Sequence, residues 1–529
     1  MKQRAGKRRA FRGAGVALPL AFAAMMSPFS TLAAQQQAAS VVIHADQPGP
    51  RIDRHIYGQF AEHLGHGIYE GLWVGEHSRI PNVHGFRKDV IAALRELKVP
   101  VVRWPGGCFA DEYHWRDGIG PRSSRPVTLN TNWGGVPETN AFGTHEFLEF
   151  AQLIGADAYV NGNLGTGSPR EMAEWLQYMT ADSPTSLTAE RARNGHPKPW
   201  KIAYFAVGNE AWGCGGQMSP DHYIDLFRQY ANFLKRPVGA PPIILATGGY
   251  DNDTAWAEAL AAKGGVNVGA ISFHYYTIPG DTWQNKGPAV GFGEDQWIST
   301  LAHTLRMDDY ITHNSAVMDK SDPGKKIGLA IDEWGTWYDP EVGREPGFLN
   351  QQNTLRDALV AALNFNIFHH HADRVRMANI AQMVNVLQAM ILTNGPQMIL
   401  TPTYHIFRMF KPFQDATYLP AELDAPHYTF GDTSVPAVSL SAARALDGAI
   451  AVALVNLDPK NTIPVTVRIS GADAQQVDAT ILTASAMDAR NTFEDPDVVR
   501  PADFTGASLK DGVLSLTLPA KAVVVLNLR

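Results

Sequence analysis

Two glutamates, Glu210 and Glu333, stand where a side chain could carry out acid–base chemistry. Each directly follows an apolar run, IAYFAVGN at 202–209 and IGLAID at 327–332. A carboxylate at the end of a buried strand is unfavourable unless it is paired or functional. Cleavage of a glycosidic bond requires two carboxyl groups, one to protonate the leaving oxygen and one to attack or stabilise the anomeric carbon. The pair therefore indicates glycosidic-bond chemistry.

The elements that would position these glutamates alternate between short apolar runs and helical stretches. This alternation predicts parallel strands joined by helices, and eight such units between 58 and 410 predict a (β/α)₈ TIM barrel. An open doubly wound sheet is the alternative, but the glycines at 165 and 167 lack the third glycine of a dinucleotide-binding loop. The predicted strands are 58–62, 100–105, 158–163, 202–210, 243–248, 270–275, 327–333 and 377–382. The predicted helical segments include 86–98, 146–154, 170–179, 221–234, 253–262 and 354–368.

The barrel prediction brings the two glutamates together. Side chains at the carboxyl ends of barrel strands project into one mouth, and strands four and seven face each other across it. Glu210 and Glu333 end those two strands. A separation of about 5–5.5 Å between the carboxyl groups would give retention of configuration, and about 6.5–9.5 Å would give inversion.

A second domain follows the barrel. From 411 to 529 the apolar runs become short and several alternate with period two, which predicts an antiparallel β-sandwich. The segment 35–57 contains a lone strand-like run, SVVIH at 40–44, which we expect to join a sheet of that sandwich.

The first 34 residues have the pattern of an export signal. They carry six basic side chains and no acidic one, then an apolar stretch at 16–26 and small residues at 32–34. The segment KRRAFR at 7–12 resembles a twin-arginine signal, and a Sec signal with adjacent arginines is the alternative. We therefore expect an exported protein, periplasmic or secreted.

The charge of the remaining chain excludes some partners. Beyond residue 34 it has 39 basic and 52 acidic side chains, a net charge of −13. An acidic protein is poorly suited to nucleic acid, whose binding depends on neutralising phosphates. Outside the first 34 residues no apolar run reaches the ~18 residues that a membrane span needs. We expect no nucleic-acid partner and no membrane span.

Five motifs give the chain a family resemblance. They are GQFAEHLG at 58–65, RWPGGCF at 103–109, GNEAW at 208–212, SFHYY at 272–276 and DEWG at 332–335. In this order they resemble glycoside hydrolase family 51, chiefly α-L-arabinofuranosidases, in which a barrel precedes a β-domain. The resemblance implies a retaining enzyme that releases terminal non-reducing α-L-arabinofuranosyl residues from arabinan, arabinoxylan or arabino-oligosaccharides of the plant cell wall.

The resemblance also implies roles for individual residues. Glu210 would be the general acid/base and Glu333 the nucleophile. The residues that would bind the sugar are Glu62, Arg103, Asn209, His274, Tyr276 and Gln382. Three of them have a purely structural alternative: Glu62 as an ion-pair acid, Arg103 as a partner of Asp111 or Glu112, and His274 as a core histidine.

The cysteines and a histidine tract are the remaining candidates. Cys108 and Cys214 fall in loops after strands two and four, where they form either a disulfide or two separate thiols. The tract His369–His371 lies at the end of a predicted helix without metal-ligand spacing, so we expect a solvated helix end, no metal and no cofactor.

Other functions fit the same motifs. An endo-β-1,4-glucanase or a β-xylosidase of the same family would differ in the shape of its subsites. A non-catalytic carbohydrate-binding barrel is a third reading, although both carboxylates are present. The resemblance further suggests a homo-oligomer.

Overall fold

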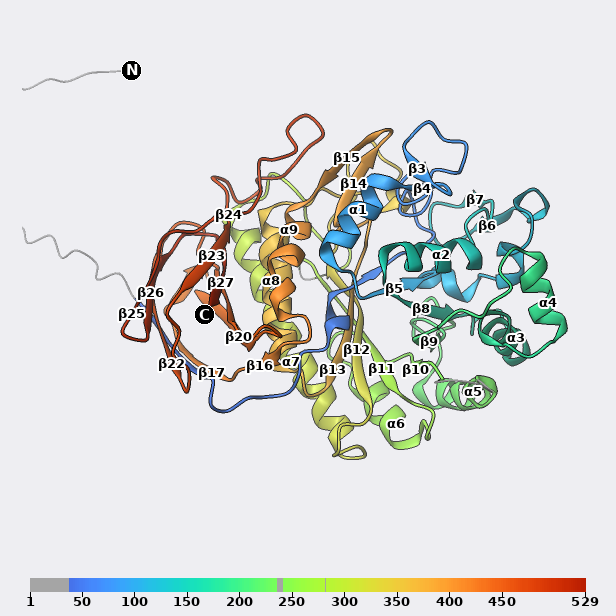
Figure 1. Cartoon of the computed structure of the whole chain (residues 1–529), viewed down its shortest axis with the longest axis horizontal. Coiled ribbons are helices and arrows are strands. Elements are labelled where there is room, and N and C mark those ends of the chain that lie inside the picture. Colours follow the sequence, from blue (N-terminus) through green and yellow to red (C-terminus); the bar gives the residue numbers. More distant parts are fainter. Residues whose placement is uncertain (1–37, 236–240, 281) are drawn as a thin grey trace, which may run out of the picture. The chain divides into compact units, whose positions relative to one another are not determined.

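A closed barrel of eight parallel strands forms the first part of the protein. The computed structural model describes residues 38–235, 241–280 and 282–529. In chain order the barrel strands are β2 (Gly58–Phe60), β5 (Val101–Trp104), β8 (Asp157–Gly162), β9 (Tyr204–Val207), β10 (Ile243–Ala246), β11 (Ala270–Thr277), β12 (Gly328–Thr336) and β13 (Val375–Ile380). β13 pairs with β2 and closes the ring (Figure 1). The predicted barrel is confirmed.

Helices cover the outside of the barrel. They are α1 (Lys88–Leu97), α2 (Thr144–Ile154), α3 (Pro169–Thr180), α4 (Ser186–Arg193), α5 (Pro220–Phe233), α6 (Ala255–Lys263), α7 (Glu294–Asp319), α8 (Leu355–His370) and α9 (Pro402–Met409). α1 illustrates how the sequence fixes one of them. It buries Val90, Ile91, Leu94 and Leu97 at helical spacing, and Lys98 ends it in the left-handed conformation.

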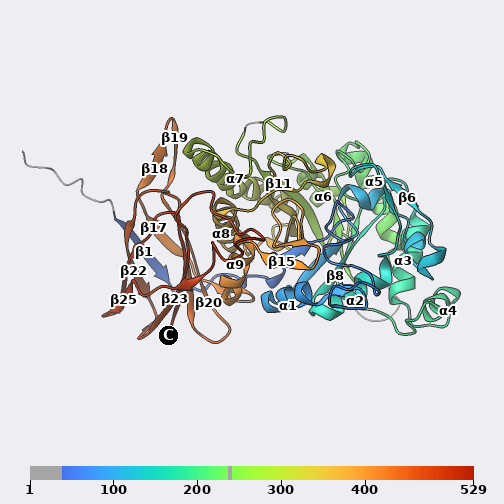
Figure 2. The same ribbon diagram turned by 90° about the horizontal axis from the view of Figure 1, so that it is seen from above.

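The second part is a β-sandwich of two sheets. One sheet has the order β17 (Ala421–Asp424), β1 (Ala39–His44), β22 (Ile463–Ser470), β26 (Val513–Leu518) and β25 (Ala507–Lys510). The other has the order β16 (Thr417–Tyr418), β20 (Val438–Arg444), β21 (Ile450–Asn456), β27 (Val523–Leu528), β23 (Val477–Leu482) and β24 (Ala502–Asp503). β1, from the start of the described chain, lies among these late strands (Figure 2). It pairs in parallel with β22, so the sheet is mixed rather than wholly antiparallel.

Short hairpins complete the strands. They are β3 (Asn82–Val83) with β4 (Phe86–Arg87), β6 (Thr128–Asn130) with β7 (Val136–Glu138), β14 (Ile391–Asn394) with β15 (Gln397–Leu400), and β18 (His427–Phe430) with β19 (Thr433–Pro436). β6–β7 follows β5, and β14–β15 follows β13. Both hairpins therefore extend from loops at the carboxyl ends of barrel strands.

α8 connects the barrel to the sandwich. It contacts β12 on one side and β20 and β21 on the other, so nearly all of its residues are buried. His369 lies in this contact, with Nδ1 2.7 Å from the hydroxyl of Ser441 and Nε2 2.7 Å from that of Tyr57. The expected solvated helix end is therefore wrong at His369, because the sandwich packs onto that face of the helix.

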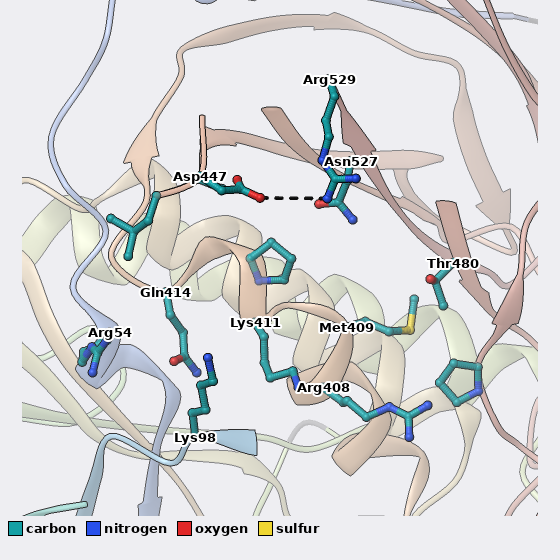
Figure 3. A pocket seen from close by; sticks show the side chains of 14 residues that line it. Arg54, Lys98, Arg408, Met409, Lys411, Gln414, Asp447, Thr480, Asn527 and Arg529 are labelled. Carbon is teal, nitrogen blue, oxygen red and sulfur yellow. Dashed lines mark ion pairs between the residues drawn. The ribbon is translucent and has the colours of Figure 1, made fainter. Parts of the chain in front are cut away.

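A cavity of about 550 Å³ also lies between barrel and sandwich (Figure 3). Its lining includes Arg54 and Lys98, which precede barrel strands, and Asp447, which pairs with Arg529 at 3.9 Å. Because it opens near the amino ends of the strands, it lies on the opposite side from the carboxyl ends that carry the glutamates.

Within the residues that the structure describes, no helix is both long and apolar enough to cross a membrane. The predicted export signal, 1–34, lies outside the described residues.

Candidate active site

The structure brings Glu210 and Glu333 to the same mouth of the barrel. Glu210 lies three residues after β9, and Glu333 lies within β12. One oxygen of each carboxylate and one nitrogen of His274 all lie within 4.8 Å of one another. An approach this close between the nearest oxygens favours the close carboxyl pair of a retaining glycosidase over the wider pair of an inverting one.

The backbone near each glutamate departs from regular structure. Gly208 and Glu210 have positive φ values of 81° and 38°, so the chain turns sharply as β9 ends. A non-glycine residue with positive φ is strained and is held there by its surroundings. In β12 the pairing with β13 shifts between Ile331 and Trp334. This irregularity allows the consecutive residues Asp332 and Glu333 both to reach polar partners at the mouth.

Two donors hold Glu333. Arg103 on β5 donates from Nη1 to Glu333 Oε1 at 2.7 Å, and the hydroxyl of Tyr276 on β11 donates to Oε2 at 2.7 Å. Arg103 also donates from Nη2 to Asn209 Oδ1 at 2.5 Å. All four side chains are buried. A carboxylate with a donor on each oxygen is fixed in position, as a nucleophile requires.

His274 lies between Glu210 and a second acid. Its Nδ1 is 2.7 Å from Glu210 Oε1, and its Nε2 is 3.1 Å from Asp332 Oδ1. Burial lowers the pKa of His274, but the charges of Glu333 and Asp332 and both hydrogen bonds outweigh burial and raise it to about 10. The imidazole is therefore protonated and donates to both carboxylates.

Of the carboxylates near His274, Asp332 has a pKa that is lowered below its ordinary value. Burial raises its pKa, but the charges of Arg103 and His274 and the hydroxyl of Tyr159, at 2.7 Å, outweigh burial and lower it to about 2. Asp332 thereby keeps His274 charged and fixes the orientation of its ring.

Glu210 has the electrostatic character of a general acid. Burial raises its pKa, the hydrogen bond from His274 opposes the rise, and the charge of Glu333 adds to it, so that the net shift is upward. A raised pKa keeps a carboxyl group protonated closer to neutral pH. His274 donates to Oε1, and Oε2 accepts no hydrogen bond from His274.

Glu62 and Gln382 form a second group of linked polar side chains at the mouth. Glu62 Oε1 accepts from the backbone N–H groups of Gly107 and Phe109 at 2.9 and 3.2 Å, and Oε2 accepts from Gln382 Nε2 at 3.0 Å. Burial and the charge of Glu333 raise the pKa of Glu62 to about 7. Gln382 Oε1 is buried and has no partner, so an acceptor is free for a hydroxyl of a bound molecule.

A disulfide joins two loops of the mouth. Cys108, after β5, is bonded to Cys214, after β9, across a Cα–Cα distance of 5.6 Å. Beside it, Asp111 accepts from the backbone N–H of Asn209 at 2.9 Å and from those of Leu164 and Gly165 at 2.7 and 2.9 Å. Both contacts fix the loop that carries Asn209 and Glu210.

The sequence-predicted residues are therefore found together, with two differences. Arg103 pairs with Glu333 and Asn209, so its structural alternative, a pair with Asp111 or Glu112, is not what the structure shows. The sequence places Asp332 beside Glu333 at the end of an apolar run but gives it no role, and it does not single out Tyr159. Asp332 lies in the middle of β12, and Tyr159 lies in the first half of β8.

The fold and the site define a class. A (β/α)₈ barrel with two facing glutamates at its mouth, one with a raised pKa and one held by donors, is the arrangement of a glycoside hydrolase. The family pattern "Alpha-L-arabinofuranosidase 1 domain" matches residues 93–287, and "Alpha-L-arabinofuranosidase C-terminal domain" matches 332–522.

Individual relatives place the chain more closely. A protein of Bacteroides ovatus, named intracellular exo-alpha-L-arabinofuranosidase, is 47% identical over 93% of this chain and 96% of its own length. A probable alpha-L-arabinofuranosidase C of Aspergillus niger is 32% identical over 83% of this chain and 88% of its own. The crystal structure of the GH51 arabinofuranosidase from Xanthomonas axonopodis pv. citri has a TM-score of 0.93 and 52% identity, covering 93% of this chain and all of the other. The chain belongs to the α-L-arabinofuranosidases of glycoside hydrolase family 51.

These relatives decide several predictions. The family resemblance is confirmed, and the endo-glucanase, β-xylosidase and non-catalytic readings are not favoured. The prediction of an exported, periplasmic or secreted protein is contradicted, because the Bacteroides relative is named intracellular. The basic and apolar composition of residues 1–34 does not by itself establish export. The homo-oligomer stays a prediction.

Proposed function

We propose that Glu333 and Glu210 release terminal non-reducing α-L-arabinofuranosyl residues by double displacement, with Glu333 as nucleophile and Glu210 as general acid/base. The substrates we propose are arabinan, arabinoxylan and arabino-oligosaccharides of the plant cell wall. The observation that carries the mechanism is the approach of one oxygen of each carboxylate to within 4.8 Å, together with the raised pKa of Glu210.

In the first step Glu333 attacks the anomeric carbon while Glu210 Oε2 gives its proton to the leaving oxygen. A covalent glycosyl-enzyme forms, and the negative charge of Glu333 is lost as its oxygen becomes an ester. In the second step Glu210, now ionised, accepts a proton from water as the water attacks the same carbon, and the ester bond breaks to release Glu333 as a carboxylate. His274, held by Asp332, supports the ionised form of Glu210 in this second step.

The surrounding polar groups supply the sugar contacts. Asn209 uses its oxygen to accept from Arg103, so its NH₂ group is available to donate to a sugar hydroxyl. Gln382 offers its free Oε1 as an acceptor. Glu62 orients Gln382 through a hydrogen bond. Arg103 and Tyr276 position Glu333 for attack on the sugar.

Azide rescue separates the two catalytic roles. With p-nitrophenyl α-L-arabinofuranoside as substrate, both Glu210→Ala and Glu333→Ala should lose most activity, and azide should restore part of it. Glu210→Ala should give the α-configured azide, because azide intercepts the glycosyl-enzyme. Glu333→Ala should give the β-configured azide in one inverting attack. Product configurations by NMR that are the reverse of these would show that the roles are wrongly assigned.

A further inference from the structure

The disulfide at the barrel mouth lies directly against the proposed general acid. Cys214 Sγ is 3.6 Å from Glu210 Oε2, the oxygen that faces away from His274. It is also 3.7 Å from the side-chain nitrogen of Asn209. Reduction of the disulfide, or binding of a ligand to its sulfurs, would therefore alter the surroundings of the oxygen that carries the proposed catalytic proton.

This disulfide is open to reagents from solvent. Cys214 is exposed and Cys108 is half-buried. Exposed disulfides exchange with external thiolates more readily than buried ones, because exchange requires access to one sulfur along the line of the bond. The more exposed sulfur, that of Cys214, is the point of attack.

Reduction would leave three metal-binding groups together. The two sulfurs and a carboxylate oxygen of Glu210 all lie within 4.8 Å of one another. In a tetrahedral zinc site the ligand atoms are ~3.3–3.8 Å apart, since Zn–S and Zn–O distances are about 2.3 and 2.1 Å. Cleavage of the sulfur–sulfur bond lets the two side chains, with Cα atoms 5.6 Å apart, open to that separation.

We propose that reduction of the Cys108–Cys214 disulfide creates a binding site for a thiophilic divalent cation such as Zn²⁺, with both thiolates and Glu210 as ligands, and that the bound ion stops hydrolysis. The inhibitory part rests on the proposed role of Glu210. A metal on its carboxylate takes the place of the proton that must reach the leaving oxygen. The oxidised protein lacks thiolate ligands, so the disulfide protects the active site from such ions.

The reaction balances with a dithiol as reductant. One of its thiolates attacks Cys214 Sγ, which forms a mixed disulfide and releases the thiolate of Cys108. The second thiol of the reductant displaces Cys214 and closes a cyclic disulfide. Two electrons and two protons pass to the protein, and Zn²⁺ then replaces the two thiol protons.

A second group of potential ligands provides the internal comparison. Glu210, His274 and Glu333 also lie close together, and this group contains no sulfur ligand. In the structure both nitrogens of His274 are already engaged, one by Glu210 and one by Asp332. Inhibition through this group would be the same in the reduced protein and in a variant whose two cysteines are serines, and this distinguishes the two sites.

The test compares three proteins: oxidised, dithiol-reduced and desalted under nitrogen, and the double variant Cys108→Ser/Cys214→Ser. For each we would count thiols, record the absorption of added Co²⁺, and measure the Zn²⁺ concentration that halves hydrolysis of p-nitrophenyl α-L-arabinofuranoside. The reduced protein should show two thiols and a sulfur-to-cobalt charge-transfer band. Its half-inhibiting Zn²⁺ concentration should be at least ~10-fold below those of the other two, since only it offers thiolates.

Three results would overturn the proposal: no thiols after treatment without denaturant, no charge-transfer band, or equal zinc sensitivity of the reduced protein and the double variant. Glu210→Ala in the reduced state adds a readout that is independent of catalysis. It should keep the band but bind Co²⁺ more weakly, and unchanged affinity would exclude Glu210 as a ligand. Failure of the azide experiment would instead refute the catalytic role and leave the band unaffected.

Discussion

Replacing His274 by asparagine isolates the charge that acts on the general acid. Asparagine places a neutral N–H donor where His274 Nδ1 lies, 2.7 Å from Glu210 Oε1, and removes both the positive charge and the contact with Asp332. Glutamine instead reaches toward Asp332 and leaves Glu210 without its donor. The two variants therefore separate the effect of charge from that of the hydrogen bond.

The expected change in the pKa of Glu210 follows from Coulomb's law. Two unit charges about 4 Å apart interact by about 4 kcal/mol at an effective dielectric constant of 20. Removal of that attraction would raise the pKa of Glu210 by up to ~3 units, at 1.36 kcal/mol per unit. Asparagine keeps one donor and water enters the vacated space, so we expect a rise of about 1–2 units for His274→Asn and a larger one for His274→Gln.

The assay is the pH dependence of kcat/KM on p-nitrophenyl α-L-arabinofuranoside. The alkaline limb reports the general acid in the free enzyme, and it should move to higher pH in both variants. The maximal rate should fall about 10- to 100-fold, because a less acidic and less firmly held Glu210 protonates the leaving oxygen less well. His313→Asn is a matched control, since His313 is exposed on α7 and contacts Asn252. An alkaline limb that stays in place, or moves down, would refute the argued influence of His274 on Glu210.

Three further predictions concern the site and its support. Arg103→Lys should lower kcat/KM about 10- to 100-fold in steady-state kinetics, because a single ammonium group cannot hold Glu333 and Asn209 together and a charged hydrogen bond contributes about 1.5–3 kcal/mol. Cys108→Ser/Cys214→Ser should lower the free energy of unfolding in urea by about 2–4 kcal/mol, since the bond closes a loop between residues 106 apart. Burial lowers the pKa of His145 to about 4 from 6.5, so its contribution to stability is present above pH 6.5 and is lost as the pH falls toward 4. Urea midpoints measured between pH 4 and 7 should therefore depend less on pH in His145→Gln, and an unchanged slope would contradict this.

The barrel could be predicted because its strands are buried on both faces. All residues of β9 and β12 are buried, and the apolar runs YFAV of β9 and GLAI at the start of β12 stand out from the polar loops around them. α7 was not anticipated, although it is a 26-residue helix. It packs against β11 and α8 of the barrel layer and also against β18 and β19. Its buried positions include Thr300, His303, Thr304 and Asn314, so polar residues interrupt the apolar stripe that marks a helix in the sequence.

The catalytic pair could be predicted for a related reason, and its supporting contacts could not. Glu210 and Glu333 are acids at the ends of apolar runs, which is a local signal. The contact of His274 with Asp332 joins residues 58 apart in the chain, and Asp111 reaches the backbone of Asn209 across 98 residues. The contact of His274 with Asp332 depends on the register of β11 against β12, which shifts between Ser272 and His274. No periodicity in one segment encodes that shift.

The hydrogen bonds of the three glutamates explain why Glu210, rather than Glu333 or Glu62, is suited to protonate the leaving oxygen. Both oxygens of Glu333 already accept from protein donors, Arg103 and Tyr276. Both oxygens of Glu62 also accept hydrogen bonds, from two backbone N–H groups and from Gln382. Although the pKa of Glu62 is raised, neither oxygen is free to present a proton to a substrate. Glu210 accepts from His274 on one oxygen only, and its other oxygen faces the disulfide and the mouth. The number and placement of donors therefore support the proposed division of this acidic cluster, with Glu333 as nucleophile, Glu62 as the residue that orients Gln382, and Glu210 as general acid.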